Sequence, residues 1–182
     1  MPVGFFDDFP GSLERPLPPD ASDPPAGMVG GFVSERVVLV RAEMAYAAIQ
    51  AFEAFPSGVQ FELVARFHDR DLDPETWHPL LRDHRGLRIG VQFADGRSGA
   101  TELFAAHPRA MRPGGVLISP RGGVGHRDEH HMRMWLWPLP PPRPMNWISV
   151  WQEMDVGERS AEVDGSELVA AAANADRLWP DG

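Results

Sequence analysis

The sequence predicts a mainly β domain, an antiparallel β-sandwich for which an immunoglobulin-like arrangement is the first choice and a jelly roll the second. Three observations lead to this fold class: about eight short segments with strand-like periodicity, turn residues between them, and a single helical pattern near the C-terminus. We expect residues 1–34 to form an irregular arm rich in proline and glycine. Residues 35–182 should form one domain that ends in an α-helix over about residues 165–179. With 182 residues, of which 43% are hydrophobic, the chain is long enough to bury a core of its own.

The predicted arm is interrupted by proline too often for a helix or a central strand to run through it. Its prolines are Pro2, Pro10, Pro16, Pro18, Pro19, Pro24 and Pro25. The tip of the arm is different, because it carries Phe5, Phe6 and Phe9 beside two aspartates. Phenylalanine side chains are costly to leave in water. We therefore expect the tip either to fold back on its own domain or to dock on another protein or another copy of the chain.

Strand periodicity starts after the arm. Residues 36–42 are β-branched and apolar, and residues 44–55 continue the pattern, although the alanines of the second segment would also suit a helix. Residues 59–67 alternate between apolar and polar side chains, which indicates a strand with one face in water. The turn residues Pro56-Ser57-Gly58 between the last two segments predict a hairpin.

The middle of the chain adds shorter strands. Residues 68–86 are polar and irregular, and we expect a loop there. Residues 87–93 alternate again, and Asp95-Gly96 suits a tight turn before a short strand at about residues 100–104. The pattern therefore predicts a second hairpin.

An aromatic-rich region follows. Residues 116–119 predict a brief strand, and residues 122–125 a glycine-rich loop. Residues 132–137 and 145–151 both have strand character, and together they hold four of the six tryptophans. The proline-rich connection between them predicts either a wide hairpin or a crossover between sheets.

The helical pattern comes last. Asp164 can cap its N-terminus, Glu167 can reach back to complete the cap, and Pro180 ends the pattern. The apolar residues recur at intervals of three and four; they are Leu168, Ala171, Ala172, Ala175, Leu178 and Trp179. Because most of this face is alanine, the helix can lie close to the sheet.

One polar cluster could hold a metal. His126, Asp128 and His130 share one parity, so in an extended segment they could converge, and imidazole and carboxylate groups are ligands for divalent metals. His130 and His131 would point to opposite faces. The alternative is a solvated charged loop. No residue set is predicted to be catalytic, so a divalent metal here is the one cofactor that we consider.

Trp135 and Trp137 share one face of their predicted strand. If that face is covered, the strand is central and the tryptophans belong to the core. If it is open, it is a binding surface, because tryptophan is common at binding hot spots. An open aromatic strip would suit a protein partner, a small ligand or a carbohydrate.

Composition excludes several classes of function. The net charge is −9 and the 17 basic residues, all arginine, are scattered, so we expect neither nucleic acid nor an anionic membrane as a partner. The absence of cysteine excludes disulfides and thiol catalysis. The N-terminus lacks the features of a secretory signal, and no apolar stretch approaches the roughly 20 residues that a transmembrane helix needs. We therefore expect a cytoplasmic protein.

The runs Trp135–Pro142, Leu178–Pro180, Phe55–Gly58 and Leu87–Gly96 resemble hypothetical proteins of GC-rich actinobacteria. The resemblance spans about residues 36–180, and it implies no activity and no catalytic residue.

The leading functional hypothesis is a noncatalytic protein-interaction module. It would self-associate, or bind another protein, through Phe5, Phe6 and Phe9 or through the face of Trp135 and Trp137. The alternatives are a metal-dependent enzyme or metal-binding protein centred on residues 126–131, and a binder of small ligands or carbohydrate.

Overall fold

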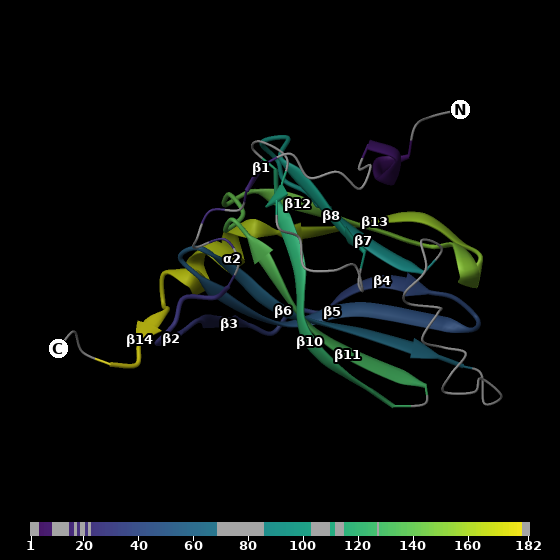
Figure 1. The fold of residues 1–182 in the computed structure, drawn as a ribbon, viewed down its shortest axis with the longest axis horizontal. Helices are drawn as coiled ribbons and strands as arrows, with labels where there is room; N and C mark the ends of the chain where they lie inside the picture. Colours follow the sequence, from purple (N-terminus) through teal and green to yellow (C-terminus); the bar gives the residue numbers. More distant parts are fainter. Residues whose placement is uncertain are drawn as a thin grey trace.

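A computed structural model of the chain describes residues 4–8, 15–16, 18, 21, 23–68, 86–102, 110–111, 115–126 and 128–179. These residues form a mainly β structure with several antiparallel sheets, as the alternating polarity predicts (Figure 1). Most of the predicted loop over residues 68–86, the end of the predicted strand at residues 100–104, and Phe9 lie outside the described residues.

The larger sheet has six strands, in the order β10–β11–β6–β5–β3, and β4 also pairs with β5. Its strands are β3 (Gly31–Val33), β4 (Val37–Arg41), β5 (Ala45–Phe55), β6 (Gly58–Phe67), β10 (Leu117–His126) and β11 (Glu129–Trp137). The predicted hairpin at Pro56 is confirmed, because Phe55 of β5 lies opposite Gly58 of β6. The alanine-rich segment before it is a strand rather than a helix, with a register shift between Gln50 and Glu53.

The smaller sheet has four strands, in the order β13–β12–β7–β8. Its strands are β7 (Leu87–Gln92), β8 (Ser98–Glu102), β12 (Pro144–Trp151) and β13 (Val156–Asp164). Because β11 belongs to one sheet and β12 to the other, the proline-rich connection between them is a crossover rather than a hairpin. The remaining described strands form two short pairs, β1 (Arg15–Pro16) with β9 (Ala110–Met111) and β2 (Met28–Val29) with β14 (Asp176–Arg177).

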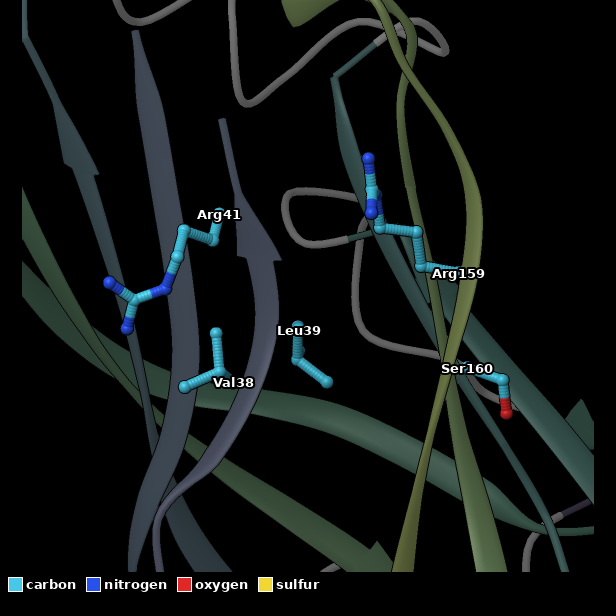
Figure 2. Close-up of a pocket in the computed structure, with 5 residues that line it drawn as sticks. All are labelled: Val38, Leu39, Arg41, Arg159 and Ser160. Atoms are coloured by element: carbon cyan, nitrogen blue, oxygen red, sulfur yellow. The ribbon is translucent and has the colours of Figure 1, made fainter. Parts of the chain in front are cut away.

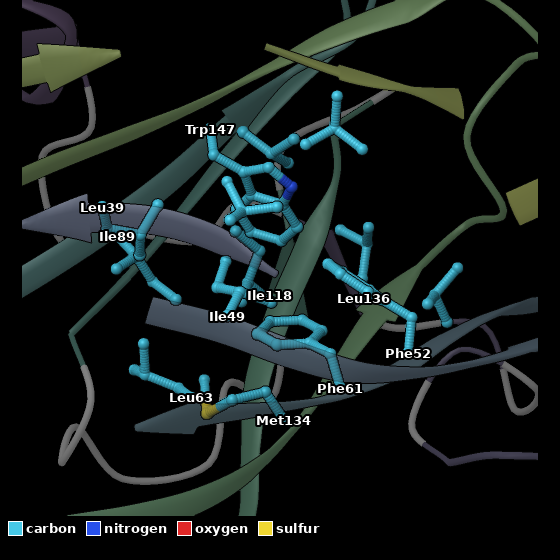
Figure 3. Packing of buried hydrophobic residues seen from close by; sticks show 14 of the residues in the cluster. Leu39, Ile49, Phe52, Phe61, Leu63, Ile89, Ile118, Met134, Leu136 and Trp147 are labelled. Atoms are coloured by element: carbon cyan, nitrogen blue, oxygen red, sulfur yellow. The ribbon is translucent and has the colours of Figure 1, made fainter. Parts of the chain in front are cut away.

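The inner faces of the two sheets share one hydrophobic core. Phe61 of the larger sheet meets Trp147 of the smaller sheet edge to face, with 5.1 Å between ring centroids (Figure 3). The helix α2 (Gly165–Ala172) adds Leu168 and two alanines to the same core. The 3₁₀ turns η1 (Phe5–Asp8) and η2 (Gln152–Met154) complete the elements of the described residues.

The glycine-rich loop predicted over residues 122–125 is wrong, because these residues lie inside the long strand β10. A β-carbon on Gly125 would come within 2.6 Å of the imidazole Nδ1 of His130 on β11. Glycine is needed here for close packing against a neighbouring strand rather than for a turn. The strand predicted at residues 116–119 is longer than expected, because β10 extends from Leu117 to His126.

The predicted helix begins where expected but ends early. The carboxylate of Asp164 accepts a hydrogen bond of 2.9 Å from the backbone N–H of Ser166, which confirms the N-cap. The helix stops at Ala172 rather than near residue 179. The side chain of Asn174 then donates to the carbonyl of Ala170, and the chain leaves in extended form to pair as β14 with β2.

The predicted irregular arm also ends earlier than residue 34. After the last of its prolines, Met28–Val29 pairs with β14 and Gly31–Val33 pairs with β5. These residues contain no proline, so their backbone N–H groups can donate hydrogen bonds within a sheet. The edge of the larger sheet therefore includes residues of the predicted arm.

Candidate functional site

The outer face of the smaller sheet carries a small apolar surface. Ile148 and Val150 project from β12 on the side away from the core, whereas Trp147 and Trp151 project into it, as strand alternation requires. Ala100 of β8 belongs to the same outer cluster. A sheet face of this kind needs a cover, because exposed aliphatic side chains cost free energy.

The N-terminal tip is that cover. We call Phe5–Asp8, the turn η1, the tip; in Figure 1 it is the purple turn beside the smaller sheet. The ring of Phe6 is buried and packs in one cluster with Ile148 and Val150. Phe5 is half-buried and meets Phe6 edge to face, with 5.2 Å between ring centroids. The tip therefore folds back on its own domain, which is one of the two outcomes expected for it.

Gly90 of β7 makes room for the first phenylalanine. A β-carbon at this position would overlap Cε1 of Phe5 and lie 3.0 Å from its Cζ. Any other residue would have to push the ring away from the sheet. The site thus combines an aromatic ring with a matching gap in the sheet surface.

A hydrogen bond and a cation–π contact also hold the tip on the sheet. The backbone N–H of Phe5 donates a hydrogen bond of 2.9 Å to Oε2 of Glu158. The guanidinium of Arg88 lies 4.6 Å from the ring centroid of Phe6, within the range of a cation–π interaction. We call Gly90, Arg88, Ile148, Val150 and Glu158 the tip site.

The predicted tryptophan surface is covered at Trp135. Trp135 is fully buried, and its indole N–H donates a hydrogen bond of 2.9 Å to the carbonyl of Ala21 from the arm. Trp137 is partly buried. An ion pair between Asp23 and Arg121 joins the same stretch of arm to β10. The side chain of Trp135 is thus packed inside the fold, where no partner reaches it without displacing the arm.

The predicted metal ligands do not converge. The chain reverses between His126 of β10 and Glu129 of β11, which lie opposite each other, while His130 lies opposite Gly125. Successive residues on a strand alternate faces, so His126 and His130 point to opposite sides of the sheet. His126 and Asp128 are exposed and His130 is buried. Within the described ranges, no three histidine, aspartate or glutamate side chains are placed to hold a metal.

Sequence reasoning missed a charged cluster on the outer face of the larger sheet. The ring of His131 bridges two carboxylates, with Nδ1 at 2.9 Å from Oε1 of Glu62 and Nε2 at 2.7 Å from Oε1 of Glu129. Arg66 pairs with Glu129 at 2.6 Å. These residues come from β6 and β11, and only their register brings them together.

The contacts in this cluster shift its pKa values. The hydrogen bond to Glu62, followed by that to Glu129, raises the pKa of His131 against the opposing effect of burial. Burial acts to raise the pKa of Glu62, but hydrogen bonds from Gln50 and His131 outweigh it and lower that pKa. The hydrogen bond from Arg66 is the main cause that lowers the pKa of Glu129.

These shifts predict how stability depends on pH. Because the pKa of folded His131 lies above its usual 6.5, its contribution is complete below pH 6.5 and is lost as the pH rises through the raised value. For the two glutamates the contribution is present above pH 4.5 and is lost as the pH falls through their lowered values. In urea denaturation we expect His131→Gln to remove the loss of stability above pH 6.5. His126→Gln changes an exposed histidine outside the cluster and should keep this loss of stability. If the free energy of unfolding changes with pH in the same way in wild type and His131→Gln, the role given to His131 is contradicted.

A groove of about 400 Å³ opens between β4 and β13 (Figure 2). It is lined by Val38, Leu39, Arg41, Arg159 and Ser160. Sequence reasoning did not single out these residues, because they come from the edges of two different sheets and no local pattern connects them.

Comparison of the chain with protein-family models, with curated proteins and with solved structures found no match. The resemblance to actinobacterial hypothetical proteins therefore stays a prediction. In the part of the chain that the structure describes, no helix has the length and apolar character to span a bilayer.

Proposed function

We propose that this chain is a noncatalytic protein-interaction module that self-associates through its N-terminal tip. The tip is the ligand, and the tip site on the smaller sheet is the receptor. The observation that carries the proposal is the seating of Phe5 over Gly90, where a side chain on the sheet would collide with the ring. One chain thus contains both halves of a recognition pair.

The same contacts can form between two copies. Phe5 and its partner Glu158 are 153 positions apart in the sequence, so nothing in the chain's local geometry ties them together. Residues 9–14 separate the tip from the anchored strand β1, a length of chain that can reach up to roughly 25 Å. Exchange of an identical segment between copies reproduces every contact and is a low-cost route to a dimer.

The proposal also includes the type of sandwich, the class of partner and the cellular location. A two-layer sandwich is supported by the single core that the two sheets share, whereas the immunoglobulin-like and jelly-roll arrangements stay predictions. A protein rather than a nucleic acid is the proposed partner, and the cytoplasm the proposed location, on the basis of the net charge of −9 and the lack of cysteine.

A pair of complementary variants tests the exchange. Gly90→Val blocks the receptor and leaves the tip intact, so this variant can supply its tip to another chain but cannot receive one. The double variant Phe5→Ser, Phe6→Ser keeps the receptor and lacks the tip, so it can only accept. We expect each variant alone to remain at 20.1 kDa in light scattering, and the mixture to form a one-to-one complex of twice that mass.

The control adds Phe5→Ser and Phe6→Ser to the Gly90→Val chain, which should abolish the complex. Circular dichroism and tryptophan fluorescence establish that each variant is folded. A mixture of folded donor and acceptor that stays at the monomer mass at every concentration would sink the proposal.

A further inference from the structure

The groove between β4 and β13 exists because the two sheets meet there without a hydrogen-bonded ladder. Strand β4 pairs with β5 and β13 pairs with β12, and among the described residues no backbone hydrogen bond joins β4 to β13. The register of β4 shifts between Val38 and Val40, and the carbonyl of Leu39 instead accepts a hydrogen bond of 3.0 Å from the buried hydroxyl of Ser149. This bond holds β4 in place beside β13 while the space between their edges remains open.

The groove is positively charged in an acidic protein. Arg41 and Arg159 stand on its two walls, with Val38 and Leu39 between them (Figure 2). Neither arginine has a carboxylate partner in the described part of the chain, and Arg41 only stacks on Tyr46, at 5.5 Å from the ring centroid. By contrast, three other arginines are neutralised in ion pairs; these are Arg66, Arg97 and Arg121. In Figure 2 the guanidinium of Arg41 points away from Arg159, whereas that of Arg159 lies beside the groove. Against a net charge of −9, Arg159 therefore makes the groove a local site for an anion.

The chemistry of the lining indicates what kind of anion fits. Guanidinium groups bind carboxylates and phosphates through paired N–H donors. The floor between them is aliphatic, since Leu39 is buried and Val38 exposes 37% of its surface. A volume of about 400 Å³ lies within the range of small-molecule sites. We propose that this groove binds a small amphiphilic anion, with its carboxylate or phosphate on Arg159 and a short apolar body over Val38 and Leu39.

This site is separate from the tip site, so it can be tested in the full-length chain whatever the outcome of tip exchange. Isothermal titration calorimetry would use four probes: hexanoate, hexyl phosphate, inorganic phosphate and neutral hexanol. We expect saturable binding of hexanoate or hexyl phosphate that is tighter than binding of inorganic phosphate or hexanol, because only the amphiphilic anions use both parts of the groove.

Variants locate the site. Arg159→Gln should weaken the binding by about tenfold or more, and Arg41→Gln should weaken it less. Arg133→Gln removes an exposed arginine of β11 that does not line the groove, and it should leave the binding unchanged. The same three variants should unfold at similar urea concentrations, because exposed arginines contribute little to stability. No saturable binding to the wild type, or an equal loss in Arg133→Gln, would overturn the proposal.

Discussion

Replacing Trp147 with alanine is expected to lower the free energy of unfolding by about 3–5 kcal/mol. Its side chain is fully buried, and its ring packs from the smaller sheet onto Phe61 of the larger sheet. Among the described residues its indole N–H has no hydrogen-bond partner, so the loss comes from packing between the two sheets. Because domains are stable by only about 5–15 kcal/mol, this single change removes a large share of the total.

Urea denaturation followed by circular dichroism measures the loss. Trp179→Ala is the matched control, because that tryptophan exposes 72% of its surface and its removal should change stability by less than about 0.5 kcal/mol. Equal effects of the two substitutions would mean that the sheets do not share the core described above.

The second large effect is expected at Gly31 of β3, where helix α2 lies directly against the strand. A β-carbon on Gly31 would overlap the carbonyl oxygen of Ala171 and lie 2.6 Å from its carbonyl carbon. Both atoms belong to helix backbone and cannot rotate away, so Gly31→Ala must move the helix from the sheet. We expect a loss of about 1–3 kcal/mol in the free energy of unfolding.

Gly157→Ala provides the control, since a β-carbon at that exposed position meets no atom of the described residues within 4 Å. The same denaturation experiment should find it within about 0.5 kcal/mol of the wild type. A Gly31→Ala protein as stable as the control would contradict the close contact between α2 and β3.

The sequence predicts features that depend on neighbouring residues. Alternation between positions 59 and 67 identifies β6 and its buried face, because side chains on a strand alternate between two environments. The cap at Asp164 is equally local. Composition alone also indicates that the phenylalanines of the tip need a cover.

Features that depend on distant partners are missed. The local sequence predicts a loop at Gly125, because only the structure shows that His130 lies beside it on the next strand. The end of α2 depends on Asp176–Arg177 pairing with β2, which no local pattern reveals. For the same reason the sequence predicts an aromatic tip but not its receptor. In the sequence Gly90 is only a small residue of an alternating strand, and its role appears when the structure places Phe5 against it.

The central claim, that Phe5 lies on Gly90, is tested most directly by nuclear magnetic resonance. We expect nuclear Overhauser contacts between the ring protons of Phe5 and the α-protons of Gly90, and an upfield shift of those α-protons that disappears in Phe5→Leu. Absence of the contacts, with Gly90 at the same chemical shift in both proteins, would contradict the claim.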